Sequence, residues 1–365
     1  MENLYFGNTE IKGGFWKYYG DLDRNVTVKS VYDRFEETGR FDALKCNWRE
    51  GMPNKPHMFW DSDVAKWIEG AAYLIEMHPE PELEAKIDEL VERIAKNQRA
   101  DGYFNSYFLT VTPSEIYTNR GWHELYCTGH FTEAAIAYHR ATGKRTLLDC
   151  MLKNIELIYK VFVVEKSASF VTPGHQEIEL ALLKLYRYLG NPMHLELAKF
   201  FIDKRGNNEI EDRTAQRTDD FAARDLQSAA GHCVRAGYYY SAMATLSLLT
   251  GDKGLNDACH RLFDDITLRK MAAAMKNSTS YSEKVVPGGF NADGTIAEDS
   301  SMVTVEDETT DVKVTGYNLT SVTAEEAEVV FGRIQGSTDI NIIADADLVI
   351  EAATEDMEAK KALFA

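Results

Sequence analysis

The chain has few cysteines, a deficit of positive charge and no long apolar run. Its five cysteines form neither a Cys-x-x-Cys pair nor an adjacent pair. We therefore expect free thiols in a reducing, cytoplasmic compartment rather than a disulfide framework. No segment is long and apolar enough to cross a bilayer. The 40 Lys and Arg residues face 58 Asp and Glu residues, a net charge of -18. This charge argues against nucleic acid and anionic membranes as partners.

The remaining composition is that of a globular protein. Over 365 residues, 44% are hydrophobic and 27% are charged, which is enough to bury a sizeable core. The 18 tyrosines and 5 tryptophans suit a sugar-binding cleft, although a large core uses such residues as well. The opening MENLYFG resembles a protease-site tag that lacks one glutamine, so we treat residues 1–13 as a tag and leader.

One pattern recurs along the chain: a Gly-His pair, an apolar helix, and a turn that contains glycine. It is seen in HELYCTGHFTEAAIAYHRATG from His123, PGHQEIELALLKLYRYLG from Pro173, and AGHCVRAGYYYSAMATLSLLTG from Ala230. DSDVAKWIEGAAYL from Asp61 is a divergent copy. Repetition at intervals of tens of residues is typical of repeat architectures, and the unit here is a helical hairpin.

Two kinds of helix alternate in these hairpins. Some are apolar nearly all round and are expected to be buried on every side; they span 62–77, 131–141, 176–188 and 233–249. Each is followed by a helix with one apolar stripe or mixed character, at 83–97, 145–162, 194–204 and 255–270. Gly143, Gly190 and Gly251 are placed to end helices in the left-handed conformation.

An inner helix, a short turn and an outer helix, repeated, close most naturally into an α/α barrel of the six-hairpin toroid type. A solenoid is the alternative. We predict a mainly α fold in which residues 14–271 form an incomplete α/α barrel of four or five hairpins. Residues 272–330 have no helical periodicity, and we expect a small β-rich segment or linker there.

Six motifs occur along residues 14–271 in this order: DSDVAKWIEGAAYL, NQRADGYFNSYF, HELYCTGHFTEAAIAYHRATG, PGHQEIELALLKLYR, AKFFIDKRG and GHCVRAGYYY. Together they resemble the β-L-arabinofuranosidase family of glycoside hydrolases. The resemblance implies a six-hairpin α/α barrel that hydrolyses terminal β-L-arabinofuranosides with retention of stereochemistry. It also implies a cysteine thiolate nucleophile, a glutamate acid/base, and a zinc held by Cys and Glu.

The catalytic motifs of that family are not present. After Met271 the sequence departs from the family pattern, and it contains no Glu-x-Cys and no adjacent cysteines. Zinc needs about four thiolate, imidazole or carboxylate ligands, and the family's set is absent. We therefore expect no zinc and no other cofactor, leave the catalytic residues unassigned, and expect weak or no turnover by this chain.

The resemblance does extend to residues that contact the sugar. His130, His175 and His232 each follow a glycine in the repeated unit, and they match histidines that hydrogen-bond sugar hydroxyls in the family. An imidazole can donate and accept at once, which suits a hydroxyl. Asp61 and Asp63 form a second candidate set. In each case the structural alternative is helix capping, by the histidines or by Asp61.

Other functions remain open at this point. An unsaturated glucuronyl hydrolase uses a similar barrel with aspartate acid/base chemistry, and a non-catalytic sugar-binding or scaffold protein needs no catalytic groups. Cys127 and Cys233 lie beside the histidine motifs, but we interpret both as small buried hydrophobes. A carbohydrate is the expected partner. Because missing hairpins would leave apolar inner helices exposed, either the tail covers them or the chain forms a homo-oligomer.

The end of the chain, GRIQGSTDINIIADADLVIEAATEDMEAKKALFA, resembles a fragment of the 3-hydroxyacyl-CoA dehydrogenase family over residues 331–365. Such a fragment corresponds to the middle of a Rossmann domain. The phosphate-binding Gly-x-Gly-x-x-Gly that should precede it is missing, so we do not expect NAD to bind. A barrel joined to a dehydrogenase fragment suggests a chimera.

Overall fold

The computed structural model describes residues 10–207 and 213–270, together with the backbone of a short antiparallel hairpin. That hairpin consists of β1 (Val305–Glu308) and β2 (Asp311–Val314), with Val305 opposite Val314. Its second strand is the DVKV segment of the predicted β-rich region. The rest of 272–330 and the Rossmann-like fragment 331–365 lie outside the described residues.

The first part of the described chain consists of short helices. They are α1 (Gly14–Leu22), α2 (Val28–Glu37) and α3 (Arg40–Ala43), with a π-helical turn at Asp23–Thr27 between the first two. Helix α2 ends where Gly39 adopts a left-handed conformation with φ of 79°, which glycine reaches at no steric cost.

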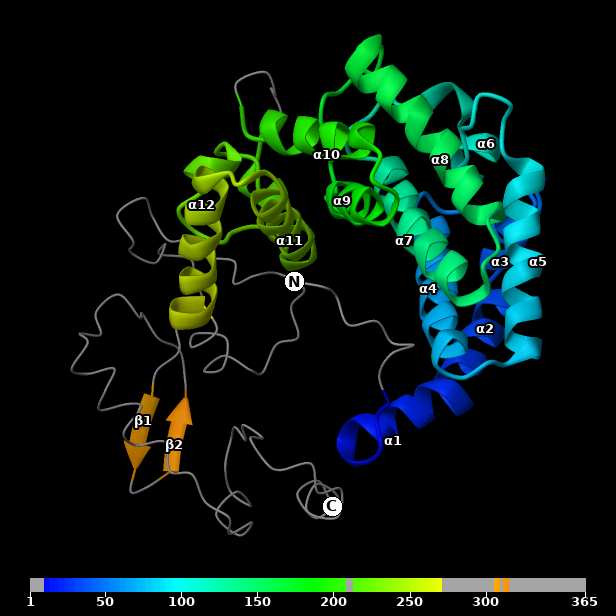
Figure 1. Ribbon diagram of the computed structural model, residues 1–365, viewed down its shortest axis with the longest axis horizontal. Helices are drawn as coiled ribbons and strands as arrows, with labels where there is room; N and C mark the ends of the chain where they lie inside the picture. The colour runs from blue at the N-terminus through cyan, green and yellow to red at the C-terminus, as the bar shows by residue number, and fades with distance from the viewer. Residues whose placement is uncertain (1–9, 208–212, 271–304, 309–310, 315–365) are drawn as a thin grey trace.

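Four helical hairpins follow in the part of the chain that the structure describes, and Figure 1 shows them arranged as an open arc. The inner layer consists of α4 (Trp60–Met77), α7 (Glu124–Thr142), α9 (Ile178–Leu189) and α11 (Cys233–Thr250). The outer layer consists of α5 (Pro81–Asn97), α8 (Thr146–Tyr159), α10 (Pro192–Lys204) and α12 (Lys253–Asp264). This is the predicted incomplete α/α barrel, with its inner and outer helices assigned correctly.

Burial explains the alternation of the two layers. On α7, every side chain from Glu124 to Ala135 is buried, because α4 packs on one side of this helix and α9 on the other. Outer helix α5 instead buries one stripe and exposes charged residues on its other face. The stripe consists of Leu83, Ile87, Leu90, Val91 and Ile94. The hydrophobic effect therefore sorts the helices into layers according to how much of their surface is apolar.

Glycine ends three of the inner helices, as predicted. Gly143, Gly190 and Gly251 follow α7, α9 and α11 with φ of 74°, 73° and 71°. Other short elements connect the hairpins. They are α6 (Ser106–Thr110), 3₁₀ turns at Pro113–Glu115, Ala215–Arg217 and Ala223–Asp225, and π-helical turns at Lys160–Val164 and Asp265–Lys270.

Three predicted helix starts were wrong. Helix α4 begins at Trp60 with Phe59 at its N-cap, so Asp61 lies in the first turn and does not cap the helix. Helix α7 begins at Glu124 rather than 131, which places His130 in its second turn. Helix α9 begins at Ile178, so His175 lies in the loop before it. The polar HELYCTGH segment is helical because its whole circumference is packed, and packing overrides its weak helix propensity.

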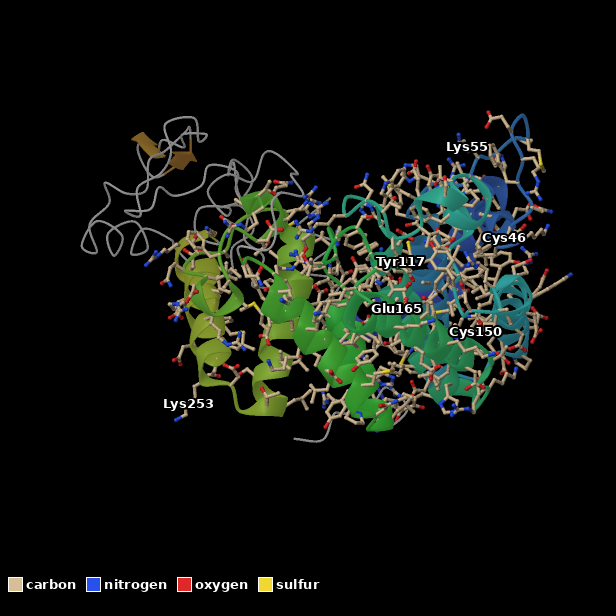
Figure 2. All side chains as sticks on the ribbon, turned by 90° about the horizontal axis from the view of Figure 1, so that it is seen from above. Cys46, Lys55, Tyr117, Cys150, Glu165 and Lys253 are labelled. Carbon is tan, nitrogen blue, oxygen red and sulfur yellow. The ribbon has the colours of Figure 1, made fainter. Side chains whose placement is uncertain are left out.

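The last hairpin has an exposed apolar edge. Seen from above, the helical arc runs from the loop of Lys55 at one end to Lys253, at the start of α12, at the other (Figure 2). At this second end Val234 and Leu248 of α11 are 38% and 78% exposed, and Phe263 of α12 is 63% exposed. In a closed barrel such positions would face the next hairpin. Among the described helices, none is long and apolar enough to cross a membrane.

Candidate functional site

A cavity of about 320 Å³ lies at one end of the inner layer. Its walls come from the starts of α4, α7 and α11 and from the loop before α9. The lining residues are Phe59, Ser62, Asp63, Lys66, His123, Tyr126, His175, His232, Val234 and Arg235. Pockets of this size and mixed polarity are typical of sites for small ligands.

Three histidine rings form a row along the cavity. The centroids of His123 and His175 are 5.5 Å apart, and those of His175 and His232 are 5.7 Å apart. His175 and His232 were predicted to lie in one cleft, and both line it. Neither caps a helix through its side chain: His232 occupies the N-cap of α11 without a side-chain cap bond, and His175 precedes α9.

His130, the third predicted histidine, does not line the cavity. Its side chain is only 2% exposed and lies against the ring of Tyr126, with centroids 4.5 Å apart. The Tyr126 ring also contacts His175, with centroids 4.2 Å apart. Tyr126 and His175 line the cavity, and His130 packs against Tyr126 outside the lining. The repeat pattern alone could not show this, because it did not reveal that α7 starts two turns earlier.

Two of the cavity histidines, His123 and His175, are neutral at pH 7. Burial lowers the pKa of His123 to about 4, and the nearby Arg235 lowers it further. Burial likewise lowers the pKa of His175 to about 3, against a hydrogen bond between its Nδ1 and the carbonyl of Gln176 that raises it. A neutral imidazole keeps one donor and one acceptor, the combination that a hydroxyl group needs.

Two cationic side chains complete the polar lining. Lys66 of α4 donates from Nζ to the hydroxyl of Tyr126 at 2.8 Å, and its ammonium lies 4.9 Å from that ring's centroid. Arg235 of α11 lines the cavity beside His232. Its guanidinium is half-buried, and its pKa is lowered by burial and by Arg217 and Arg205. These groups supply fixed donors for oxygen-rich ligands.

Of the two predicted aspartates, Asp63 lines the cavity and Asp61 does not. Asp63 forms an ion pair with Arg40, with Oδ2 and Nε 2.9 Å apart. Asp61 is 2% exposed and accepts hydrogen bonds from the backbone N–H and the hydroxyl of Ser106 at the start of α6. Burial raises the pKa of Asp61 to about 6. Asp61 therefore anchors α6 to α4 rather than facing a ligand.

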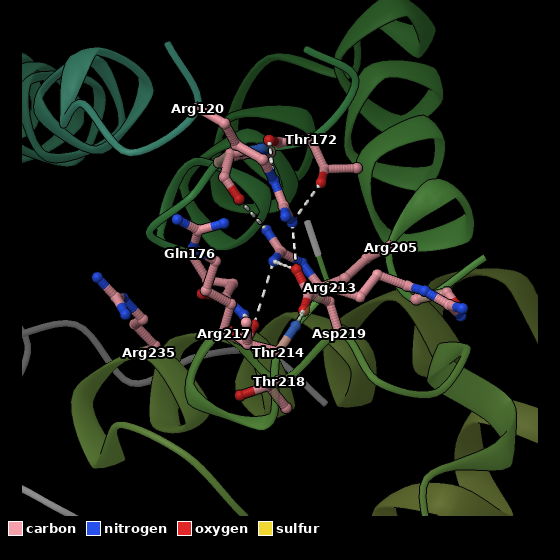
Figure 3. Close-up of polar contacts among 12 residues, drawn as sticks. Arg120, Thr172, Gln176, Arg205, Arg213, Thr214, Arg217, Thr218, Asp219 and Arg235 are labelled. Atoms are coloured by element: carbon pink, nitrogen blue, oxygen red, sulfur yellow. Dashed lines mark hydrogen bonds and ion pairs between the residues drawn. The ribbon is translucent and has the colours of Figure 1, made fainter. Parts of the chain in front are cut away.

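A buried network of arginines holds the loops beside the cavity (Figure 3). Arg120 pairs with Asp219 and also donates to Thr172, which links three segments that are distant in sequence. Arg205, which is fully buried, donates to the carbonyl of Pro173 at 2.6 Å and pairs with Glu179 at 3.2 Å. The loop that carries His175 is therefore fixed on both sides.

The glycine of each Gly-His pair permits a close approach of another segment. A Cβ on Gly129 would lie 1.4 Å from Oε2 of Glu177, and a Cβ on Gly174 would lie 2.0 Å from the carbonyl oxygen of Arg120. At Gly231 the obstruction would be the carbonyl oxygen of Ala215, at 2.2 Å. The repeated motif thus reflects packing at the inner-helix starts as much as it reflects the histidines.

Cys127, beside the site, does not have the environment of a nucleophile. All five cysteines are free, and Cys127 is buried with its Sγ donating to the carbonyl of Met58 at 3.5 Å. Cys233 is only half-buried, so its interpretation as a buried hydrophobe was wrong. Burial raises the pKa of the Cys127 thiol well above its ordinary value. A reactive thiol needs a lowered pKa, so the interpretation of Cys127 as a small buried residue is confirmed.

Sequence reasoning missed His123, Tyr126, Lys66 and Arg235 as site residues. Part of the signal was present, because His123, Tyr126 and His130 follow a helical i, i+3, i+7 spacing on one face of α7. Lys66 and Arg235 had no comparable signal. A single cationic residue in an inner helix gives the same sequence pattern whether its side chain faces solvent or a cavity.

An arc of helical hairpins with a polar cavity at one end of its inner layer defines an α/α-barrel protein. The family model for the GH127 catalytic domain of β-L-arabinofuranosidases matches residues 8–303, and the chain belongs to that family. The match extends beyond the resemblance predicted for residues 14–271. A second model, for the NAD-binding domain of 3-hydroxyacyl-CoA dehydrogenases, matches residues 296–365.

Relatives with known names support the family assignment. The chain is similar to a non-reducing end β-L-arabinofuranosidase of Bifidobacterium longum subsp. longum, with 36% identity over 240 residues that span 59% of this chain and 36% of that protein. A GH127 β-L-arabinofuranosidase from Geobacillus stearothermophilus T6 matches with a TM-score of 0.67 and 36% identity, over 72% of this chain and 45% of that one.

Another GH127 β-arabinofuranosidase structure matches with a TM-score of 0.66 and 29% identity, over 72% of this chain and 43% of that one. The chain therefore spans between about a third and a half of the length of these relatives.

The zinc that the family resemblance implies does not fit the residues described here. The sequence contains none of the cysteine motifs of that zinc, and Cys127, at the site, has a raised pKa that opposes metal binding as a thiolate. Within the described residues, the cluster of possible ligands that lies close enough for one ion contains Glu69, His130 and Glu133, and no cysteine.

Proposed function

We propose that this chain provides the sugar-binding part of a GH127 β-L-arabinofuranosidase and that the cavity receives a terminal β-L-arabinofuranose. The observation that carries the proposal is the row of His123, His175 and His232, the first two of them neutral, along a cavity of about 320 Å³. Neutral imidazoles and the lysine and arginine donors suit the hydroxyls of a small sugar. The choice of β-L-arabinofuranose as the sugar rests on the relatives, which are named as β-L-arabinofuranosidases.

We also propose that the chain has little or no hydrolytic activity and needs no cofactor. The sequence lacks the Glu-x-Cys and Cys-Cys motifs of the family, and the cavity lining includes neither a cysteine nor a glutamate. The test is release of nitrophenol from nitrophenyl β-L-arabinofuranoside. Release no faster than in buffer is expected, whereas turnover at ordinary enzyme rates would contradict this part of the proposal.

The rival glucuronyl hydrolase chemistry has less support. It needs aspartate acid/base groups at the mouth of the inner layer, and Asp63 is the carboxylate of the described cavity lining. That carboxylate is paired with Arg40, and Asp61 is engaged with Ser106. Binding of an unsaturated glucuronide in preference to the arabinofuranoside would revive it.

The three predicted histidines should respond differently to substitution. His175→Ala and His232→Ala remove groups that line the cavity, so each should weaken arabinofuranoside binding and change the melting temperature little. His130→Ala removes a side chain that is 2% exposed, so it should lower the melting temperature by several degrees. Calorimetric titration and thermal unfolding check both outcomes. Unfolding of the His175 variant would show that His175 acts in packing instead.

The dehydrogenase-like end is proposed not to bind NAD. No Gly-x-Gly-x-x-Gly occurs in the sequence, so the phosphate-binding turn of that fold is missing. A micromolar dissociation constant for NAD in calorimetry would overturn this statement.

A further inference from the structure

A second polar cluster lies behind the cavity, between three inner helices. Glu69 of α4 and His130 and Glu133 of α7 each offer one oxygen or nitrogen atom, and these atoms lie within 4.8 Å of one another. His130 and Glu133 are one helical turn apart, and their side chains are 2% and 7% exposed. The ring of Tyr126 contacts both His130 of the cluster and His175 of the cavity lining.

A fourth side chain reaches the cluster from the loop before α9. Glu177 is fully buried, and its Oε1 lies 3.7 Å from Nδ1 of His130. That separation is too long for a hydrogen bond, and Glu177 is not among the three side chains whose ligand atoms lie within 4.8 Å of one another. Its carboxylate is therefore placed as an outer partner of the cluster. Gly129 makes this position available, because any Cβ there would occupy the place of the Glu177 carboxylate.

Two side chains of the cluster lack hydrogen-bond partners among the described residues. Both carboxylate oxygens of Glu177 and both ring nitrogens of His130 are buried without one. Buried polar groups are normally hydrogen-bonded, and an isolated buried carboxylate is costly. The unpartnered His130 ring, next to the carboxylates of Glu69 and Glu133, therefore points to a ligand that binds one of its nitrogens.

The local charge indicates the sign of that ligand. Lys184 pairs with Glu133, with Nζ and Oε1 2.5 Å apart, and so offsets one of the three carboxylates. Glu69 accepts a hydrogen bond at 2.6 Å from the hydroxyl of Tyr73, and this hydroxyl is neutral. Lys66, the other ammonium near the cluster, donates to Tyr126 and also attracts Glu69 and Glu177. Three carboxylates face two ammonium groups, and burial raises the pKa of Glu69 and of Glu177. A bound cation would favour the ionised form of these carboxyl groups.

We propose that Glu69, His130 and Glu133 bind one divalent cation, which ties α4 to α7, and that Glu177 beside His130 acts as an outer partner of the ion. A set of one imidazole and several carboxylates suits ions such as Mn²⁺ or Zn²⁺. Its place behind Tyr126 gives the ion a structural role in the inner layer. This site has no cysteine and is separate from the zinc site that the family resemblance implies. It also does not depend on sugar binding, so failure of the arabinofuranoside test would leave it standing.

The test uses the full chain, from which metal ions are removed with EDTA followed by dialysis. Mn²⁺ is the probe because thiols bind it poorly. Electron paramagnetic resonance should show one tightly bound ion per chain, and the melting temperature should rise on its addition. His130→Gln and Glu177→Gln should each weaken Mn²⁺ binding by at least about tenfold, since even outer partners of metal ligands cost that much. If these two buried variants do not fold, Glu69→Gln, at a partly exposed position, replaces them and should weaken Mn²⁺ binding in the same way.

His194→Gln is the matched control. His194 is also fully buried with both ring nitrogens unpartnered, but it is not part of the Glu69, His130 and Glu133 group. This variant should bind Mn²⁺ as the parent does. The proposal is overturned if neither Mn²⁺ nor Zn²⁺ binds the parent. It is also overturned if His130→Gln, or Glu69→Gln in its place, binds as tightly as the parent.

Discussion

At the scale of single residues, a buried carboxylate joins segments of the fold through hydrogen bonds that the sequence did not predict. Glu124 starts α7 and is 3% exposed. It accepts hydrogen bonds from the Tyr103 hydroxyl at 2.6 Å and from the backbone N–H of Tyr117 at 3.0 Å, and so joins the loop before α7 to the helix. Burial nevertheless raises its pKa to about 7, because these bonds offset only part of the cost of burying the charge.

This raised pKa predicts a pH-dependent difference between the parent and Glu124→Gln. Glutamate in the unfolded chain titrates near its ordinary pKa of 4.5, so the unfolded state releases its proton first as the pH rises. The stability of the parent relative to the variant should therefore be fully present below about pH 4.5. It should fall as the pH rises toward about 7, by on the order of a few kcal/mol.

Urea unfolding of both proteins at several pH values measures this difference. A difference that stays constant from pH 4 to pH 8, or that grows with rising pH, would show that folding does not raise the pKa of Glu124.

The sequence predicted some site residues and not others for identifiable reasons. His175 and His232 were found because they recur after glycine in a repeated unit, and their positions near helix starts place them at one end of the inner layer. His130 follows the same pattern but is turned toward Glu69 and Glu133. Its place depends on where α7 begins, which hydrophobic periodicity could not show because the first two turns are polar and yet buried.

At the scale of elements, the close contact between α7 and the start of α9 depends on Gly129. A Cβ at this position would overlap the carboxylate of Glu177 at 1.4 Å and approach Cα of Ile178 at 2.9 Å. Gly129→Ala should therefore destabilise the protein by roughly 1–3 kcal/mol, since overpacking outweighs the gain in helix propensity. Denaturant unfolding measures the change.

Gly70 in the middle of α4 provides the control. Nothing lies within 4 Å of a Cβ built there, so Gly70→Ala should stabilise the protein by about 0.5–1 kcal/mol through helix propensity alone. Equal effects of the two substitutions would mean that the contact of Gly129 with Glu177 does not limit the packing of α7 against α9.

At the scale of the whole molecule, the arc of hairpins ends in an apolar edge. Leu248 and Phe263 are 78% and 63% exposed, and exposed apolar surface favours association. We expect the chain to form a homo-oligomer through this edge. The double variant Leu248→Glu and Phe263→Glu should then be monomeric in light scattering at concentrations where the parent is not.

Val164, on the outer layer, tests whether any exposed apolar residue has this effect. It is 63% exposed, and Val164→Glu should leave the oligomeric state unchanged. A monomeric parent at all concentrations would contradict the expectation and would indicate that the edge is covered within a single chain.

The central claim is that the histidine row at the inner-helix starts binds a terminal β-L-arabinofuranose, and calorimetric titration of methyl β-L-arabinofuranoside into the full chain tests it most directly. We predict saturable binding with one sugar per chain, reduced at least about tenfold, or 1.4 kcal/mol, when His175 and His232 are both replaced by alanine. Absence of saturable binding by the folded parent, or equal binding by the folded double variant, would contradict it.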